Sequence, residues 1–315
     1  MKLLVTGANG FVGKSLCAEL SRRGYVVRGA SRSADVEFGG CQQAIAVAIG
    51  PETDWSAALN DLDVVIHLAA RVHVMKDTAA DPLAEFRKVN VAGTLSLACQ
   101  AAASGVKRFV FVSSVKVNGE YTLSGQAFNE LDLPAPQDTY GVSKHEAEMG
   151  LRQIALATGM DVVIIRPPLV YGPGVKANFA ALMLAVQRGW PLPLGAVHNQ
   201  RSLVALDNLV DFIITCTVHP QAANQTFLVS DGHDVSTTEL VQRLARARGV
   251  PARLLPVPVW VLQAAAALAG KGDEVQRLCG NLQVDISKAR SLLGWMPPVA
   301  MNESLQFAAA GREKQ

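Results

Sequence analysis

A glycine-rich turn directly after the first apolar run constrains the fold more than any other feature of the sequence. Between Thr6 and Gly13, the glycines Gly7, Gly10 and Gly13 follow the spacing G-x-x-G-x-x-G. Gly7 permits a tight turn, Gly10 lets the backbone approach a pyrophosphate, and Gly13 lets a following helix pack closely on a sheet. The helix N-terminus would then present free N–H groups to the anion. Because an apolar run precedes the turn and an amphipathic stretch follows it, we predict a dinucleotide-binding turn, not merely a tight connection, at Gly7, Gly10, Phe11, Val12 and Gly13.

Short apolar runs alternate with amphipathic stretches over the first two-thirds of the chain. Several of the runs are almost entirely apolar, as expected for parallel strands that are covered on both faces. A repeating order of strand and helix implies right-handed crossovers and an α/β fold with a doubly wound parallel Rossmann sheet. The predicted strands are residues 2–5, 25–28, 44–49, 64–68, 108–113 and 162–166, and the main predicted helices are 12–23, 83–103 and 141–157.

The pattern changes after residue 166, where prolines and glycines interrupt the chain and helices no longer alternate regularly with strands. We therefore predict two domains. Residues 1–174, with about 206–232, form the NAD(P)-binding Rossmann domain, and residues 208–218 and 227–229 return to its main sheet. Residues 175–205 and 233–315 form a smaller C-terminal α/β lobe that binds the substrate.

Composition excludes several classes of protein. A formal net charge of +2 with 18% charged residues gives no basic field for nucleic acid. The chain opens without the apolar segment and cleavage site of an export signal, and its five cysteines are scattered, so we expect a reducing, cytoplasmic location and no metal site. The most apolar stretch, residues 257–269, is too short to span a membrane. We expect a helix there that packs in a core or at an interface, the alternative being attachment to a membrane surface.

The end of the second predicted strand bears on the choice between NAD and NADP. An acidic residue usually binds the ribose hydroxyls of NAD at this place, but the chain has Ser31 and Arg32 there and no carboxylate before Asp35. A guanidinium suits the 2′-phosphate of NADP. The cofactor is therefore predicted to be NAD(P)(H), with NADP favoured and with Ser31 and Arg32 in contact with it. The alternative for Arg32 is a solvated surface arginine.

Three residues form a predicted catalytic group. Tyr140 and Lys144 stand four apart and share one helical face, and Ser114 follows the fifth predicted strand, where such sheets bind ligands. A phenol with a pKa of ~10 is a poor base near neutrality, so the Lys144 ammonium and an oxidised nicotinamide would have to lower that pKa. Tyr140 would then exchange a proton with a substrate oxygen that Ser114 orients, and Lys144 would hold the nicotinamide ribose.

The chain as a whole resembles the extended short-chain dehydrogenase/reductase superfamily, in its branch of NDP-sugar epimerases, dehydratases and reductases. The resemblance rests on the glycine-rich turn, His67–Ala70, Asn90, Ser113-Ser114, Tyr140 with Lys144, Arg166-Pro167 leading to Tyr171–Pro173, and Asp285–Trp295. It implies that the cofactor also contacts Leu68, Ala69, Ala70, Asn90 and Pro167. It further implies a homodimer in which helices 83–103 and 141–157 pair across a two-fold axis.

The same resemblance implies a nucleotide-sugar substrate, with a UDP-sugar favoured, and the residues that bind it. Asn178 and Phe179 match the pair that holds the nucleotide diphosphate, and Arg201 matches an arginine on phosphate or ribose. Arg277 matches a second diphosphate arginine more loosely, with an ordinary surface arginine as the alternative. Ser114 would contact the sugar, and Lys116 either reaches the sugar or a phosphate or is solvated.

Departures from the family pattern narrow the reaction. The run Ser114-Val115-Lys116 lacks the carboxylates of the family's 4,6-dehydratases and decarboxylases, and Lys116 and Leu169 differ from the residues usual in galactose-type 4-epimerases. Residues 109–120 and 166–179 most resemble reductases that form UDP-N-acetylquinovosamine, which are often labelled UDP-glucose 4-epimerases. The preferred hypothesis is NAD(P)H-dependent reduction of a UDP-4-keto-6-deoxy-N-acetylhexosamine for surface polysaccharide. The alternatives are a UDP-glucose or UDP-GlcNAc type 4-epimerase with bound NAD, and a non-catalytic NAD(P)-sensing regulator.

Overall fold

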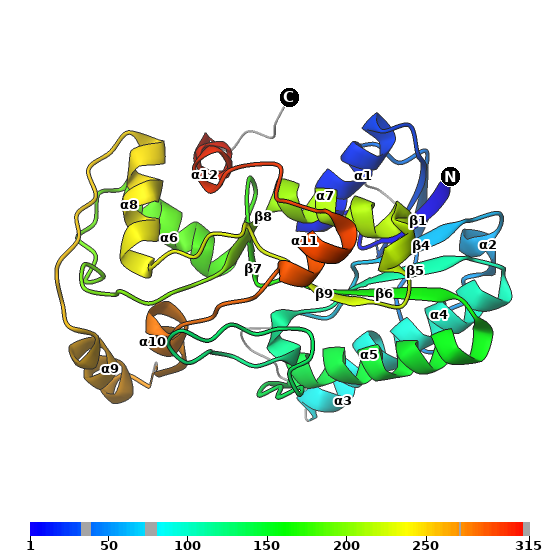
Figure 1. Ribbon diagram of the computed structural model, residues 1–315, viewed down its shortest axis with the longest axis horizontal. Helices are drawn as coiled ribbons and strands as arrows, with labels where there is room; N and C mark the ends of the chain where they lie inside the picture. The colour runs from blue at the N-terminus through cyan, green and yellow to red at the C-terminus, as the bar shows by residue number, and fades with distance from the viewer. Residues whose placement is uncertain (33–38, 73–80, 271, 311–315) are drawn as a thin grey trace.

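The computed structural model describes residues 1–32, 39–72, 81–270 and 272–310. Its centre is a seven-stranded, entirely parallel sheet with the order β3-β2-β1-β4-β5-β6-β9, which confirms the predicted Rossmann class (Figure 1). The order reverses between β1 and β4, and this is where doubly wound sheets bind their ligands. The strands are β1 (Lys2–Thr6), β2 (Val26–Ser31), β3 (Gln43–Ala46), β4 (Val64–His67), β5 (Arg108–Val112), β6 (Asp161–Arg166) and β9 (Thr226–Leu228).

The five inner strands of the sheet contribute side chains to two hydrophobic cores, because successive residues point to opposite faces. In β1, Leu3 and Val5 enter one core and Leu4 enters the other, and all three are fully buried. Helices cover both faces, so the strands can be apolar throughout. The first face is covered by α1 (Phe11–Arg22), α7 (Leu206–Val218) and α11 (Ser287–Leu293), and the second by α2 (Ser56–Leu59), α4 (Thr94–Ala103) and α5 (Thr139–Thr158).

The helix predicted over 83–103 is built from three consecutive parts. It begins as α3 (Pro82–Phe86), where the Asp81 carboxylate accepts a hydrogen bond from the Ala84 N–H at 3.0 Å. A π-helical segment, η1 (Arg87–Gly93), then leads into α4. π-helical turns inside helices are often found at functional sites. Here the π-helical segment contains Asn90, which is buried.

A smaller group of elements lies at the other end of the molecule, away from the central sheet (Figure 1). The short parallel pair β7 (Leu169–Tyr171) and β8 (Leu203–Ala205) leads into it. A third hydrophobic core unites α6 (Ala177–Gln187), α8 (Thr237–Arg248) and α12 (Met301–Ala310). The remaining elements are α9 (Val259–Leu268), α10 (Gly272–Cys279) and the 3₁₀ turns Val115–Val117 and Pro220–Ala222.

Two stretches of the chain have a structure or a position that differs from the sequence prediction. Residues 206–218 do not join the sheet, because their apolar residues recur at helical spacing and form α7, which packs beside α1. Residues 282–295, assigned by sequence to the smaller lobe, pack into the core on the α1 face of the main sheet. The two-domain division with its original boundaries stays a prediction.

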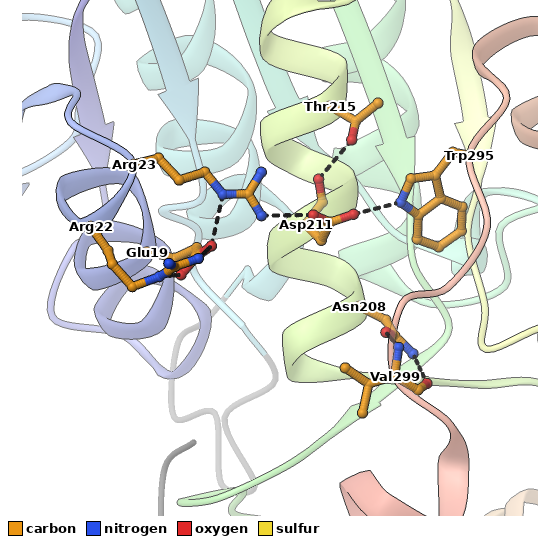
Figure 2. Close-up of polar contacts among 8 residues, drawn as sticks. All are labelled: Glu19, Arg22, Arg23, Asn208, Asp211, Thr215, Trp295 and Val299. Atoms are coloured by element: carbon orange, nitrogen blue, oxygen red, sulfur yellow. Dashed lines mark hydrogen bonds and ion pairs between the residues drawn. The ribbon is translucent and has the colours of Figure 1, made fainter. Parts of the chain in front are cut away.

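Polar contacts fix the C-terminal segment to that face (Figure 2). The carboxylate of Asp211 on α7 accepts hydrogen bonds from Arg23 at 2.7 Å and from the Trp295 indole N–H at 2.9 Å. The Asn208 side chain donates to the Val299 carbonyl at 2.9 Å and accepts from the Val299 N–H at 2.9 Å. These contacts explain why residues far apart in the sequence share one core. Among the described residues, no helix is both long and apolar enough to cross a membrane.

Candidate active site

A cavity of about 630 Å³ lies where β1 and β4 end. It is lined by the whole of the predicted glycine-rich turn, by Ser31 and Arg32 after β2, and by residues 68–72 after β4. Its position at the reversal of strand order is the usual one for a dinucleotide in such a sheet. The structure therefore brings together ten of the fourteen residues that were predicted to bind the cofactor, and the cavity lining does not include Asn90, Tyr140, Lys144 or Pro167.

The glycine-rich turn has the geometry that a pyrophosphate requires. Gly7 has a φ of +70°, a conformation that glycine adopts at little cost. A Cβ on Gly13 would lie 2.1 Å from the Gly7 carbonyl oxygen, so any side chain there would force the turn away from α1. Gly10 stands at the N-cap and has no side chain to occupy the first N–H groups of α1. These residues fit a bound NAD(P), since the helix N-terminus is left open to an anion.

At the end of β2, Ser31 is buried and Arg32 is exposed, and both line the cavity. Asp35, the first carboxylate after this strand, lies outside the described residues. Arg32 thus lines the cavity at the end of β2, where the sequence predicted a contact with the 2′-phosphate.

Replacing Arg32 by alanine tests this contact. We expect the Kd of NADPH to rise about tenfold more than the Kd of NADH, because a charge-assisted hydrogen bond to the 2′-phosphate is lost. Titration of protein fluorescence with each dinucleotide measures both constants. Arg22→Ala, at the far end of α1 in a surface ion pair with Glu19, is the matched control. Equal weakening of the two dinucleotides by Arg32→Ala would show that the guanidinium does not contact the phosphate.

The cavity is also lined by residues that the sequence did not single out. Residues 47–49, Trp55, Arg71, Val72 and Val89 all line it. Residues 47–49 follow β3, which pairs with β2, and Trp55 is fully buried. An apolar run at 44–49 was visible in the sequence, but only the pairing of strands shows that its end reaches the cofactor groove.

The remaining residues that the resemblance assigned to the cofactor lie at different depths. Leu68, Ala69 and Ala70 line the cavity directly. Asn90 is buried behind it and holds the adjoining loop, since its side chain bonds both the N–H and the carbonyl of Arg71 at 2.7 and 3.0 Å. The Pro167 carbonyl accepts from the Val115 N–H at 3.0 Å and so supports the segment after β5.

The predicted catalytic residues meet where β5 ends against the start of α5. Asp138 caps α5 by accepting a hydrogen bond from the Gly141 N–H at 2.7 Å, which places Tyr140 in the first turn and Lys144 in the second. A Cβ on Gly141 would lie 3.0 Å from the Lys116 carbonyl oxygen, so the segment after Ser114 lies directly against the first turn of α5.

Lys144 is the most buried member of the group, with 1% of its surface exposed. Its ammonium donates to the Val112 carbonyl at 2.9 Å and lies 4.4 Å from the centre of the Phe111 ring. Val112 lines the dinucleotide cavity, so Lys144 adjoins the place predicted for the nicotinamide ribose. Burial lowers the pKa of Lys144 to about 7, although the carboxylate of Glu148 works in the opposite direction.

This low pKa predicts how stability depends on pH. Between about pH 7 and pH 10 the folded chain holds Lys144 largely neutral while the unfolded chain protonates it, so stability rises with pH in this range. Below about pH 7 the cost of burying the ammonium is present in full. Lys144→Met removes this cost, and we expect the variant to be more stable than the wild type near pH 6.5, with a smaller advantage near pH 9.5. Urea unfolding of both proteins at the two pH values measures the difference. An advantage that grows with pH would contradict the assigned cause.

Tyr140 differs from the sequence expectation. Its side chain is half-buried and packs edge-on against Phe86, with ring centres 6.3 Å apart. Burial, reinforced by the negative charge of Asp138, raises the pKa of Tyr140 above its ordinary value in the protein alone. The sequence predicted that neighbouring Lys144 lowers this pKa, and that prediction is wrong for the protein alone. Burial disfavours the charged phenolate, and Lys144 has a lowered pKa of about 7 and so carries little positive charge above that pH.

A buried histidine lies below this group. His67 has no exposed surface, and its two ring nitrogens lie 2.7 Å from the Thr6 hydroxyl and 3.0 Å from the Thr94 hydroxyl. Burial, and secondarily the charge of Lys144, lower the pKa of His67 to about 3. His67 is therefore neutral, and it links β1 to α4 beneath the cofactor groove.

Lys116 is engaged by two carboxylates instead of being solvated. Its ammonium bonds Glu120 at 2.9 Å and also contacts Asp138, the residue that caps α5. A direct contact with a sugar or phosphate, as the resemblance suggested, would require these ion pairs to open. Asp138 was not singled out from the sequence, yet an aspartate just before a helix is a common N-cap and could have been recognised as one.

The residues assigned to the nucleotide by resemblance are spread over the smaller lobe. Asn178 is exposed at the start of α6, whereas Phe179 is buried and stacks on Tyr171 with ring centres 5.7 Å apart, so its side chain belongs to the core. Arg201 is half-buried and donates to the Gly280 carbonyl at 3.1 Å, and burial lowers its pKa. Arg277 is exposed on α10.

Comparison with known proteins adds a family and relatives. Residues 3–230 match the family described as "NAD dependent epimerase/dehydratase family". A Vibrio cholerae protein described as "UDP-glucose 4-epimerase" is 52% identical over 309 residues, which cover 98% of this chain and 94% of that protein.

Two crystal structures from Bacillus cereus have the same fold. One is a UDP-glucuronic acid 4-epimerase in complex with NAD, with 23% identity, a TM-score of 0.78 and coverage of 99% of this chain and 96% of the other. The second is a UDP-N-acetylglucosamine 4-epimerase with 21% identity, a TM-score of 0.79 and coverage of 98% and 96%. At these identities the likeness is one of fold.

Proposed function

Because this chain belongs to the NAD dependent epimerase/dehydratase family, we propose that it is a UDP-sugar 4-epimerase, of the UDP-glucose or UDP-GlcNAc type, that works with bound NAD. The observation that carries the proposal is the 52% identity, along nearly the whole chain, with a protein described as UDP-glucose 4-epimerase. The dinucleotide groove and the group formed by Ser114, Tyr140 and Lys144 support it. The chain is an enzyme of the short-chain dehydrogenase/reductase superfamily, so the regulator alternative is set aside.

Each residue of the catalytic group has a part in this reaction. NAD, which the glycine-rich turn and Lys144 would hold, would supply the acceptor for a hydride from C4 of the sugar and the donor for its return. In the first half Tyr140 would take the proton from O4 as a phenolate, once the positive charge of the oxidised nicotinamide lowers its pKa, and it would donate the proton back in the second half. Both steps require the phenol oxygen to sit within hydrogen-bond reach of O4. Ser114 donates a hydrogen bond to the same oxygen and orients it. Lys144, which adjoins the cavity through its bond to the Val112 carbonyl, holds the nicotinamide ribose.

The comparisons favour epimerisation over the reduction that the sequence alone favoured. Lys116 and Leu169 differ from the residues usual in galactose-type 4-epimerases, and the sequence analysis took this as evidence against a 4-epimerase. A relative of 52% identity is nevertheless described as a UDP-glucose 4-epimerase. Because Lys116 supports the cap of α5 through Asp138, its presence is compatible with the same chemistry at Tyr140.

The direct test supplies the purified enzyme with UDP-glucose or UDP-GlcNAc and no added dinucleotide. We expect conversion to the corresponding C4 epimer, UDP-galactose or UDP-GalNAc, resolved by anion-exchange chromatography. Acid extraction of the same protein is expected to release NAD in a ratio approaching one per chain. A protein that holds no dinucleotide and converts neither sugar would contradict the proposal.

One observation favours a second candidate, an NADPH-dependent 4-ketoreductase. Ser31 and Arg32 stand where an acidic residue usually binds the NAD ribose, and Arg32 lies at the cavity wall. Incubation with a UDP-4-keto-6-deoxy-N-acetylhexosamine and NADPH separates the two candidates. Only the reductase oxidises one NADPH for each sugar reduced, which is measured as the loss of the absorbance of the reduced nicotinamide. The homodimer through the helices of 83–103 and 141–157 stays a prediction for either candidate.

A further inference from the structure

Two cysteines lie side by side outside the catalytic group. Cys17 is in α1 and is fully buried, whereas Cys41 is half-buried just before β3. Their side chains form a hydrogen bond in which the Cys17 thiol is the donor and the Cys41 sulfur is the acceptor. Both cysteines are free of any disulfide. The two sulfurs are therefore in contact without a covalent bond, although they come from different parts of the sequence.

The backbone around Cys41 is fixed on both sides. Gly40 packs so closely on α1 that a Cβ there would lie 2.5 Å from the Cys17 carbonyl oxygen, and its φ of +90° suits glycine. On the other side, the Gln42 N–H donates to the Val27 carbonyl at 3.0 Å, and the Gln42 side chain accepts from the Val27 N–H at 2.6 Å. Cys41 also packs against the hydrophobic core that contains Cys17. The folded backbone thus holds Cys41 against α1, and a disulfide needs exactly this kind of close approach between two backbone segments.

The contact gives the two sulfurs different chemical properties. Cys41 is accessible to solvent, and the hydrogen bond from Cys17 lowers the pKa of its thiol, which raises the fraction of nucleophilic thiolate. The same hydrogen bond, together with burial, raises the pKa of Cys17, so Cys17 stays a neutral thiol. Cysteines that react with peroxides are accessible, have a low pKa and often lie beside a second cysteine that resolves the oxidised form.

We propose that Cys17 and Cys41 are a redox modification site that hydrogen peroxide converts into a disulfide. In the first step the Cys41 thiolate attacks the peroxide, the O–O bond breaks, hydroxide leaves and is protonated to water, and Cys41 becomes a sulfenic acid. In the second step the Cys17 sulfur attacks the Cys41 sulfur, the S–O bond breaks, and the hydroxyl group leaves with the Cys17 proton as a second water. The two sulfurs together lose two electrons, and these reduce one peroxide to two waters.

The modification site lies beside the dinucleotide cavity but does not line it. Phe11 and Gly13 at the start of α1 line the cavity, as does Arg32 at the end of β2, whereas neither Cys17 nor Cys41 does. The disulfide joins α1 to the residues that lead into β3. The proposal does not depend on which sugar the enzyme converts or on which dinucleotide it binds.

The test exposes the reduced, full-length protein to hydrogen peroxide, blocks the remaining thiols with iodoacetamide and identifies the peptides by mass spectrometry without reduction. We expect a pair of peptides linked through Cys17 and Cys41, and the loss of two of the five thiols of the chain. Dithiothreitol is expected to restore both thiols. Failure of the linked peptides to form would overturn the proposal, and so would their formation only in protein unfolded by urea, because the bond would then owe nothing to the folded contact.

Two variants separate the roles of the cysteines. In Cys17→Ala, Cys41 has no partner to resolve its sulfenic acid, and we expect peroxide to carry it on to the sulfinic or sulfonic acid. In Cys41→Ser, we expect Cys17 to stay reduced, because it has no exposed surface. Overoxidation of Cys41 to the same extent in the wild type and in Cys17→Ala, or oxidation of Cys17 in Cys41→Ser, would contradict these roles.

Cys99→Ser is the matched control, since Cys99 is an exposed cysteine on α4. We expect this variant to form the disulfide between Cys17 and Cys41 to the same extent as the wild type. A disulfide that disappears with Cys99 would show that the exposed thiol, and not the pair, is the site that reacts with peroxide.

Discussion

Replacing Tyr140 by phenylalanine is expected to lower kcat for sugar interconversion by about a thousandfold or more, with little change in dinucleotide binding. The variant loses the only atom of the side chain that can exchange a proton with O4, and positioned acid–base groups typically contribute about 10²–10⁴-fold. The ring itself is kept, so its packing against Phe86, with ring centres 6.3 Å apart, should survive. Steady-state kinetics with UDP-glucose, together with the amount of NAD released by acid, measures both effects.

Tyr25→Phe provides the control for this experiment. Tyr25 lies between α1 and β2 and packs against the core on the α1 face of the sheet, away from the catalytic group. The control is expected to keep wild-type kcat. Substantial turnover by Tyr140→Phe would refute the assigned role, and loss of bound NAD in that variant would point to a defect in cofactor binding instead.

The second large effect is expected at Glu148, whose carboxylate is fully buried behind the catalytic group. It accepts hydrogen bonds from Ser113 at 2.6 Å and from the guanidinium of Arg166 at 2.9 and 2.5 Å. Arg166 is buried as well and also donates to Asn118 at 2.9 Å. Glu148→Gln leaves the Arg166 charge buried and unpaired, so we expect the free energy of unfolding to fall by about 3–5 kcal/mol.

Glu146→Gln is a matched control, since Glu146 lies two residues earlier on α5 and is also paired with an arginine, Arg87, at 2.6 Å. That pair is partly exposed, and we expect Glu146→Gln to lower the free energy of unfolding by about 0–1 kcal/mol. Urea denaturation of the two variants gives the comparison. The double variant E148L/R166M is expected to recover part of the loss, because it leaves no unpaired charge in the core. Equal losses in the two single variants would show that burial does not set the strength of the Glu148 pair.

Much of the site could be predicted because its signals are local. The glycine-rich turn needs only a short stretch of backbone, and Gly7 and Gly13 occupy positions where other residues would strain or block it. The spacing of Tyr140 and Lys144 makes them neighbours on one helix, wherever that helix packs. The apolar runs likewise determine parallel strands, whose carboxyl ends meet at one edge of the sheet.

Contacts between distant segments could not be predicted in the same way. Lys116 is held by Glu120 and by Asp138, and the second of these pairs forms only because the end of β5 lies against the start of α5. Phe179 matched a substrate-binding pattern, yet its ring fills the core beside Tyr171. A motif specifies the residue type at a position, whereas the packing around it specifies which way the side chain turns.

The amino-acid sequence by itself determined the Rossmann class and the glycine-rich turn, and it was enough to propose the catalytic trio, since each depends on interactions within a few residues. Only the tertiary structure decided the electrostatic state of that trio, because burial around Tyr140 and Lys144 comes from strands and helices far away in the chain. It also decided that α9, an apolar segment in the sequence, turns one of its faces to solvent. Burial is a property of the whole packed molecule, and so it is not encoded in any one segment.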